Sequence, residues 1–354
     1  MIEMQYNFPL LPGLPAQWRE RLRVAVDALG DDNFDELRPT FRSDQTKLTD
    51  VGARWMGTAP ERTYLTEGAH HGSLLALMVS GLAGQTIAVD AAAYTGALVQ
   101  ARAMRCPLVG CAIDEEGMLP ESLREKCAED RVAAIYVTPT VHNPLGFVAS
   151  LARREALVEV AREFDLLIIE DDAYGYMEPA APPTLAKLAP ERTFYVRGLS
   201  KSYAPGARTG FLVVPERFLP GMLSVILNSV TGSSLVHNRA AVSLIKDGTL
   251  DRVIAEKNAA GTRRNAAARS LLRGRCWPGA RAAWHLWVNL PAGTTPQWFE
   301  QRMAERGVLI SGGNWFAASQ DAPNGFRIAL GGEVDSARAL EGVARVAEEL
   351  DGVS

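Results

Sequence analysis

The chain has 354 residues, 47% of them hydrophobic and 22% charged, with a formal net charge of −4 at pH 7. This is ordinary globular composition with room for a large core, and the acidic balance argues against a nucleic-acid-binding surface. The sequence shows no signal peptide and no apolar run near the ~20 residues that span a bilayer, so we expect a cytoplasmic protein that binds neither nucleic acid nor a membrane.

From about residue 65, short apolar runs alternate with helical patterns. The runs that we expect to be buried strands are 86–90, 133–138, 166–171, 193–199 and 209–214. Helical patterns lie between them, such as residues 151–164, which are apolar at i, i+3, i+4 and i+7. This alternation predicts an α/β large domain with a mainly parallel sheet covered by helices on both faces.

The pattern changes after about residue 232. A long helical pattern at 250–274 is followed by a strand at 283–290, a helix at 295–307 that has proline at its first position, strands at 308–313 and 326–332, and an amphipathic helix at 335–350. We expect a smaller α+β domain here, joined by the first thirty-odd residues. The predicted division is a large domain at 45–235 and a small domain made of 1–44 and 236–354.

Four strand ends carry unusual chemistry, and ligands bind beyond the carboxyl ends of strands in open parallel sheets. The first is Asn143-Pro144, which is also a plain turn signal. The second, "IIEDDAYG" at 168–175, ends in three carboxylates, for which a solvated loop is the alternative. The third is Ser200-Lys201, followed by "PGARTG" at 205–210. The fourth is a Gly-Ala turn in 64–82 that opens a helix, where backbone N–H groups bind anions.

Together these are the parts that hold pyridoxal 5′-phosphate. A lysine amine forms the Schiff base, a carboxylate pairs with the pyridinium nitrogen, and an arginine with a helix N-terminus binds the phosphate. Metal binding is not expected, because His70 and His71 are adjacent and would diverge on a helix. The cysteines (Cys106, Cys111, Cys127 and Cys276) have neither metal-site nor disulfide spacing, and we expect Cys106 and Cys111 to be core strand residues.

In these motifs the chain resembles the fold-type I (class I/II) pyridoxal-phosphate-dependent aminotransferases, close to the aminoadipate-type enzymes, over roughly residues 60–350. It is also similar to the aminotransferase-like domain of some bacterial transcription regulators. The resemblance implies a seven-stranded-type sheet in the large domain, a smaller α+β domain built from both termini, and a homodimer.

The resemblance also assigns site residues. Lys201 is the expected Schiff-base lysine and the base that later moves the substrate proton. The residues expected to bind the cofactor are Gly68, Ala69, His70, Tyr94, Asn143, Asp171, Tyr174, Ser200, Lys201 and Arg208. Asn143 and Arg327 are expected to reach the substrate carboxylate. Asp172 competes with Asp171 for the pyridinium nitrogen, and the pattern leaves that choice open.

Two features depart from the family pattern. Gly198 stands where the family often has a phosphate-binding serine, three residues before the lysine. The stretch 37–48 lacks the family's tyrosine and offers Thr40 and Phe41 instead, with Asp44 near the position of a usual glycine. Arg42 or Ser43 are candidate replacements for the lost phosphate contacts.

The leading functional hypothesis is therefore a transaminase that acts on an α-amino acid and a 2-oxo acid with ping-pong kinetics. The alternative is another reaction on the same cofactor: elimination, cyclisation, decarboxylation or oxidation. A ligand-sensing domain without turnover is not expected, because the aminotransferase pattern begins within the first 60 residues and leaves no room for a helix-turn-helix domain. The side-chain pocket depends on four aromatic residues that are either core or pocket wall, Trp284, Trp287, Trp315 and Phe316, and we expect a bulky or polar substrate.

Overall fold

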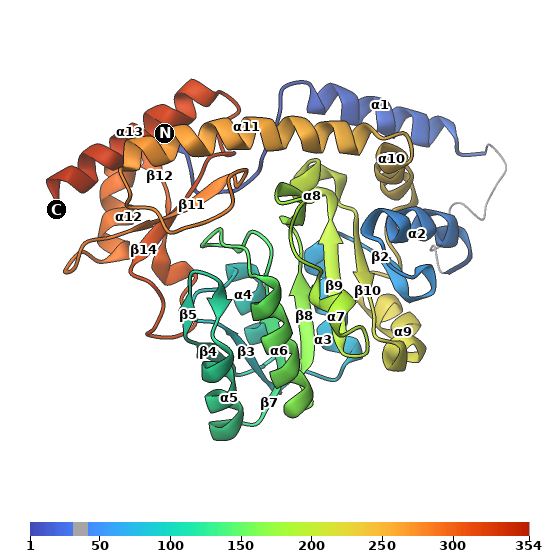
Figure 1. Cartoon of the computed structure of the whole chain (residues 1–354). Helices are drawn as coiled ribbons and strands as arrows, with labels where there is room; N and C mark the ends of the chain where they lie inside the picture. The colour runs from blue at the N-terminus through green and yellow to red at the C-terminus, as the bar shows by residue number, and fades with distance from the viewer. Residues whose placement is uncertain (31–41, 354) are drawn as a thin grey trace.

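The computed structural model describes residues 1–30 and 42–353, with residues 42–46 described by their backbone alone. Its main feature is a seven-stranded sheet in the order β2-β10-β9-β8-β7-β3-β4 (Figure 1). The strands are β2 (Thr63–Thr66), β3 (Thr86–Asp90), β4 (Leu108–Cys111), β7 (Val132–Val137), β8 (Leu167–Asp171), β9 (Thr193–Gly198) and β10 (Gly210–Val213). Only β10 runs antiparallel to its neighbours. The predicted mainly parallel sheet is confirmed.

Both faces of this sheet are covered by helices, which explains the unbroken apolar runs. In β3, Ile87 and Val89 pack into a core shared with α3, α4 and α9, whereas Ala88 packs into a core on the other face with α5 and α6. Successive strand residues point to opposite faces, so a strand buried on both sides is apolar throughout. The covering helices are α3 (Ala69–Val79), α4 (Thr95–Ala103), α5 (Pro120–Glu129), α6 (Leu151–Glu163), α7 (Leu185–Leu188) and α9 (Leu219–Ser229).

A second, smaller sheet is built from the C-terminal part of the chain. It contains β11 (His285–Asn289), β14 (Gly325–Ala329) and β13 (Ser311–Gly312). The helices α12 (Pro296–Glu305) and α13 (Ser336–Gly352) share its core. The N-terminal strand β1 (Ile2–Glu3) pairs in parallel with β12 (Val308–Leu309), so the start of the chain joins this unit. A separate hairpin pairs β5 (Ile113–Asp114) with β6 (Gly117–Met118).

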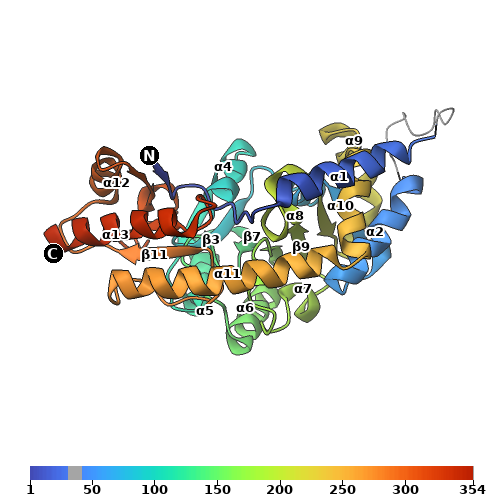
Figure 2. The ribbon, with the colours of Figure 1, turned by 90° about the horizontal axis from the view of Figure 1, so that it is seen from above.

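The long helix α11 (Thr249–Leu272) runs from the seven-stranded sheet to the C-terminal unit (Figures 1 and 2). Beside it, α1 (Leu14–Asp27) packs on α10 (Leu235–Lys246), near α2 (Arg42–Met56). The first thirty residues therefore divide, since β1 pairs with β12 in the C-terminal unit and α1 lies beside the seven-stranded sheet. The domain boundaries at 44/45 and 235/236 stay a prediction.

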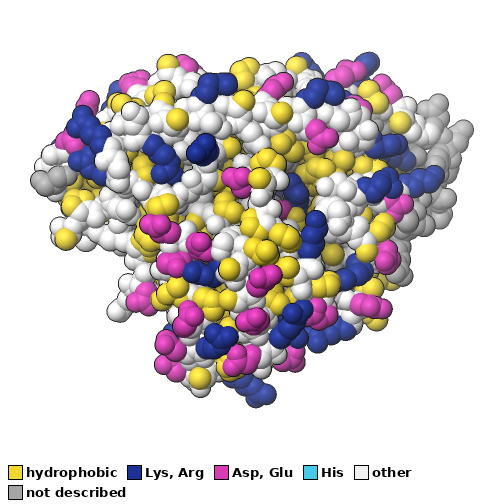
Figure 3. Space-filling model, viewed as in Figure 1, with side chains coloured by type: hydrophobic (Ala, Val, Ile, Leu, Met, Phe, Trp, Pro, Cys, Tyr) yellow, Lys and Arg dark blue, Asp and Glu magenta, His cyan; other side chains and the backbone are white. Residues whose placement is uncertain are grey.

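The surface and core add three observations. On the face seen in Figure 3, acidic and basic side chains are interspersed and do not gather by sign. Within the described ranges, no helix combines the length and apolarity needed to cross a membrane.

Cys106 and Cys111 are both buried, but only Cys111 lies in a strand. Cys106 precedes β4 in a loop, which corrects the expectation that it is a strand residue.

The close approach of β10 to the start of α3 predicts a stability defect. A Cβ atom at Gly210 would lie 2.6 Å from the carbonyl carbon of Gly68 and 2.8 Å from the amide nitrogen of Ala69, both of them backbone atoms. We expect Gly210→Ala to lower the free energy of unfolding by about 1–3 kcal/mol, measured by chemical denaturation. Gly206→Ala is the control, because a Cβ there meets nothing within 4 Å. Equal stability of the two variants would contradict this packing.

Candidate active site

The predicted cofactor residues meet at one cavity beyond the carboxyl ends of the parallel strands. The cavity measures about 240 Å³, and its lining includes every residue predicted to bind the cofactor: Gly68, Ala69, His70, Tyr94, Asn143, Asp171, Tyr174, Ser200, Lys201 and Arg208. Arg327 lines an adjoining cavity of about 400 Å³ that shares Tyr94, Asn143, Tyr174 and Lys201. Residues far apart in the sequence thus converge because the sheet brings its strand ends to one edge.

Lys201 stands at the boundary between the two cavities. It lies on the short helix α8 (Leu199–Ser202), directly after β9. Its Nζ donates a hydrogen bond to the carbonyl of Asn7 at 2.6 Å and lies 4.5 Å from the centre of the Phe8 ring. Burial, together with the positive charge of Arg327, lowers the pKa of Lys201 to about 7, against an opposing effect of Asp171. An amine with this pKa is largely neutral, and therefore nucleophilic, just above neutral pH.

Asp171 and Asp172, at the end of β8, point to opposite sides because successive side chains of a strand alternate. Asp171 lines the 240 Å³ cavity; its Oδ2 accepts a hydrogen bond from Tyr136 at 2.6 Å and its Oδ1 accepts one from the amide of Ala173 at 3.0 Å. Asp172 lies outside that lining, where it accepts a hydrogen bond from Tyr195 and lies 3.7 Å from Arg197. These carboxylates are buried, so the alternative of a solvated loop is wrong. Burial raises the pKa of Asp171, and the Tyr136 hydrogen bond opposes that rise.

Another part of the cavity lining has the chemistry of an anion-binding site. The helix α3 begins after Gly68, whose φ of +81° suits glycine, and its first residues line the cavity together with Ser200. Arg208 reaches the same place from a left-handed turn with φ of +45°, and its Nη2 donates to the carbonyl of Glu67 at 2.8 Å. Gly198, the departure from the family pattern, lies against this helix start, where a Cβ would come within 3.0 Å of the Ala69 nitrogen.

Arg327 forms the far wall of the adjoining cavity. Its Nη1 donates to Asn143 Oδ1 at 2.7 Å, and its Nη2 donates to the carbonyl of Gln5 at 2.5 Å. The guanidinium is buried, yet its Nε has no hydrogen-bond partner, and the ion pairs of the described residues include none with Arg327. A buried cation whose donors lack a carboxylate is suited to an anionic ligand.

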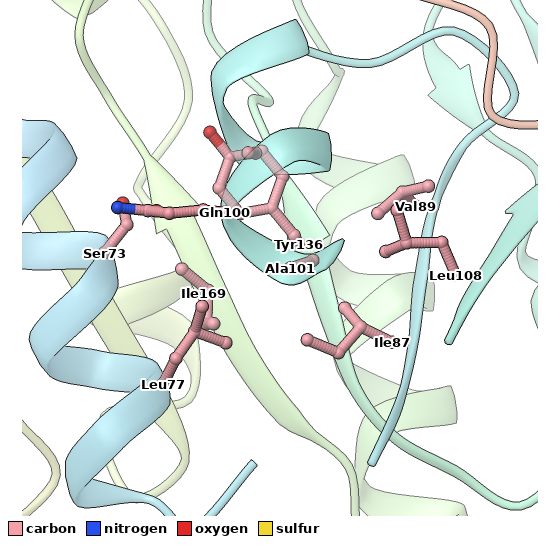
Figure 4. A pocket seen from close by; sticks show the side chains of 10 residues that line it. Ser73, Leu77, Ile87, Val89, Gln100, Ala101, Leu108, Tyr136 and Ile169 are labelled. Atoms are coloured by element: carbon pink, nitrogen blue, oxygen red, sulfur yellow. The ribbon is translucent and has the colours of Figure 1, made fainter. Parts of the chain in front are cut away.

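A different hollow lies between the sheet and the helices α3 and α4 (Figure 4). It measures about 20 Å³, room for about one water, and its mostly apolar lining includes Leu77, Ile87, Val89, Ile169 and the ring of Tyr136. This hollow is a packing defect and no ligand site. It does show how Tyr136 is held, because the ring borders the core while the hydroxyl reaches Asp171.

Sequence reasoning missed several residues of the site. Phe8 lines both cavities and Thr138 lines the first, and Asn7 bonds both Lys201 and the ring nitrogen Nδ1 of His285. Tyr136, which bonds Asp171, was missed as well. Among the missed residues only Tyr136 and Thr138 carried a signal, since they lie two residues apart at the end of β7 and so share one face. Trp284 and Trp287 are core residues, whereas Trp315 and Phe316 line the larger cavity.

The predicted replacements for the missing phosphate contacts fall largely outside the described structure. Thr40 and Phe41 lie outside the described residues, and nothing is described of the side chains of Arg42, Ser43 and Asp44. Their roles stay predictions. His70 and His71 diverge as expected: His70 lines the cavity, whereas His71 accepts a hydrogen bond from the amide of Glu67 and contacts Ser229.

The residues present fit pyridoxal phosphate by their chemistry, since amine, carboxylate and anion-binding groups line one cavity. The class that this fold and site define is that of the pyridoxal-phosphate-dependent transferases. The chain belongs to the family of class I and II aminotransferases, which matches residues 14–346. Pyridoxal phosphate is its cofactor.

Comparisons with individual proteins agree with this family. The chain is 26% identical over 313 residues to 2-aminoadipate transaminase of Thermus thermophilus, covering 85% of this chain and 78% of that one. It is 26% identical over 241 residues to the HTH-type transcriptional regulator YdeF of Bacillus subtilis, which is 68% of this chain but only about half (52%) of the regulator. The solved structure of α-aminoadipate aminotransferase LysN from Thermus thermophilus, complexed with N-(5′-phosphopyridoxyl)-L-leucine, has the same fold, with a TM-score of 0.87 at 23% identity over 100% of this chain and 92% of that one.

The lowered pKa of Lys201 predicts how cofactor attachment depends on pH. Below about pH 7 the amine is protonated, so the rate at which pyridoxal phosphate becomes attached to the cofactor-free protein should rise with pH and level off above pH 7. In Arg327→Gln the neighbouring cation is gone, so the midpoint should move to higher pH. The rate is followed by visible absorbance in stopped flow. A wild-type midpoint near 10, the ordinary value of a lysine, would contradict the burial of this amine.

Proposed function

We propose that the protein is an aminotransferase that exchanges the amino group of an α-amino acid with a 2-oxo acid by ping-pong kinetics. The observation that carries the proposal is the convergence on one cavity of Lys201, Asp171 and Arg208, with Arg327 at the wall of the adjoining cavity. Membership of the class I and II family supports the same reaction. When bound, pyridoxal phosphate supplies an aldehyde that captures amines and a pyridinium ring that withdraws electrons from the substrate Cα.

Each residue then has a proposed task. Lys201 would hold the cofactor covalently through its Nζ, and the same amine, once the substrate amine has taken its place, would accept the Cα proton and deliver it to the aldehyde carbon of the cofactor. Asp171 keeps the pyridinium nitrogen protonated through its negative charge. Asn143 and Tyr174 donate to the phenolic oxygen, and Tyr94 covers the ring.

The anionic ends of the ligands define the remaining roles. Arg208, Ser200 and the first amides of α3 hold the phosphate, with His70 beside them. Arg327 and Asn143 hold the substrate carboxylate, which would displace the carbonyl of Gln5 from the guanidinium. These contacts orient the substrate so that its Cα lies within reach of Lys201.

The adjoining cavity of about 400 Å³ supports a bulky, uncharged substrate side chain. Its lining is rich in aromatic rings, those of Tyr6, Phe8, Trp315 and Phe316. The cations in its described lining are Lys201 and Arg327, which already have tasks. The rim adds negative charge, because Glu300 accepts a hydrogen bond from the indole of Trp315 at 3.1 Å. A second carboxylate on the substrate would thus lack a partner.

Cellular location and oligomeric state are likewise proposed. We infer a cytoplasmic protein that handles only small-molecule substrates, and a homodimer, which the resemblance to the fold-type I aminotransferases implies. Sedimentation of the purified chain at several concentrations tests the dimer.

Substrate choice tests this function directly. Addition of L-phenylalanine or L-leucine to the yellow holoenzyme should bleach the visible band, and a 2-oxo acid should restore it. The kcat/KM for these two should exceed that for L-glutamate and L-2-aminoadipate by roughly tenfold or more. Lys201→Ala, the control, should not attach the cofactor covalently.

The other readings give different results in the same titration. Release of ammonia or carbon dioxide, without recovery of the band by an oxo acid, indicates the alternative chemistry of elimination or decarboxylation. Amino-acid binding without any change of the band indicates a sensor. A preference for the acidic amino acids would contradict the proposed pocket while leaving the aminotransferase intact.

The two neighbouring aspartates offer a matched pair of variants. Asp171→Asn should lower kcat by roughly 10²-fold or more, because a neutral amide does not hold the pyridinium proton. Asp172→Asn should keep kcat within a few-fold of wild type but lower the free energy of unfolding by about 1–3 kcal/mol, since Tyr195 and Arg197 lose a charged partner. The reverse pattern in steady-state kinetics would assign the pyridinium to Asp172.

A further inference from the structure

A second lysine contacts the backbone of Lys201. Lys257, on α11, is fully buried, and its Nζ donates hydrogen bonds to the carbonyl oxygens of Lys201 at 2.8 Å and of Tyr203 at 2.5 Å. Lysine is seldom fully buried without a carboxylate, and the ion pairs of the described residues include none with Lys257. This costly arrangement therefore needs a reason other than an ion pair.

The carbonyls that Lys257 binds belong to a short, largely buried segment. The helix α8 has only four residues, Leu199–Ser202, and is followed by the turn that returns the chain to Arg208. The last carbonyls of a helix lack partners within it, and a cationic side chain at a helix C-terminus can satisfy them. Here that side chain comes from another helix, so the backbone of Lys201 is tied to α11.

The helix that carries Lys257 is itself fixed at this point. Trp284 donates from its indole Nε1 to the carbonyl of Lys257 at 3.1 Å. The next residue, Asn258, donates to the carbonyl of Tyr176 at 2.8 Å, just beyond the cavity residue Tyr174. The same turn of α11 thus holds two segments of the cavity wall that are distant in sequence.

We propose that Lys257 is a positioning residue, which fixes the backbone of Lys201 so that the Lys201 amine meets the cofactor at the correct place. This inference rests on the proposed function for its catalytic consequence. Lys257 touches neither cavity, since it is absent from the lining of both. Its effect on chemistry passes through the position of the Lys201 backbone, where a misplacement of about 1 Å can cost on the order of 100-fold in rate.

The test removes the two hydrogen bonds of Lys257 without leaving a cavity in place of its side chain. Lys257→Met keeps the length and apolar stem of the side chain and removes the donors. The control is Leu272→Ala, at the other end of the same helix, which creates a cavity in the C-terminal core and perturbs stability away from Lys201.

Two readouts separate positioning from stability. In the cofactor-free proteins, hydrogen exchange of the peptide covering residues 199–204 should be faster in Lys257→Met and unchanged in Leu272→Ala. In the holoenzymes, kcat of Lys257→Met should fall roughly 10- to 100-fold with KM for the amino acid changed less than about twofold, and the circular dichroism of the bound cofactor should weaken. Leu272→Ala should keep wild-type kcat and circular dichroism despite a lower Tm.

Wild-type exchange of residues 199–204 in Lys257→Met would overturn the proposal, as would an equal loss of kcat in Leu272→Ala. Failure of the proposed function looks different. In that case the wild-type protein itself shows no turnover, while the exchange experiment on the cofactor-free chain still decides whether Lys257 holds the Lys201 backbone.

Discussion

Among the described residues, the buried Arg327 has no carboxylate partner, and this is the constraint on which the site depends. Arg327 donates to a side-chain amide and to a backbone carbonyl, and its Nε stays unpaired. Burial of a charge in this way costs several kcal/mol, which the fold tolerates where an anionic ligand completes the pairing. The same positive charge helps to lower the pKa of Lys201, so the group suited to bind a carboxylate also favours the neutral, reactive amine.

A negative charge, that of Asp171, counteracts the effect of Arg327 on Lys201. Asp171 lines the neighbouring 240 Å³ cavity, where it accepts hydrogen bonds from Tyr136 and from the amide of Ala173. It favours protonation of Lys201 while Arg327 disfavours it. The elements that carry these groups are far apart in sequence, and the parallel sheet and α11 keep them at fixed separations. The pKa of Lys201 therefore depends on how the fold packs the segments that carry Asp171 and Arg327.

The sequence predicted the parts of the molecule with strong local patterns. The strands β3, β7, β8 and β9 were found within about one residue of their bounds, because strands buried on both faces are continuously apolar. The motifs near the strand ends, together with the family resemblance, then identified ten of the residues that line the 240 Å³ cavity.

What the sequence could not predict depends on contacts across the chain. Asp171 and Asp172 are chemically identical, and only the alternation of β8 shows which one lines the cavity. Asn7 and Phe8 lie in a segment without periodicity, where no local pattern marks a residue of the site. The partners of Lys257 are two backbone carbonyls, which leave no trace in the sequence.

The path of the N-terminal segment links occupancy of the site to the first residues of the chain. The carbonyls of Gln5 and Asn7 accept hydrogen bonds from Arg327 and Lys201, the same donors that a bound amino acid and cofactor require. Just before them in the chain, β1 is anchored by its pairing with β12. Residues 5–8, which follow this anchored strand, line the two cavities and contact both Lys201 and Arg327. A protein fused ahead of Met1 would therefore be attached only a few residues from the site.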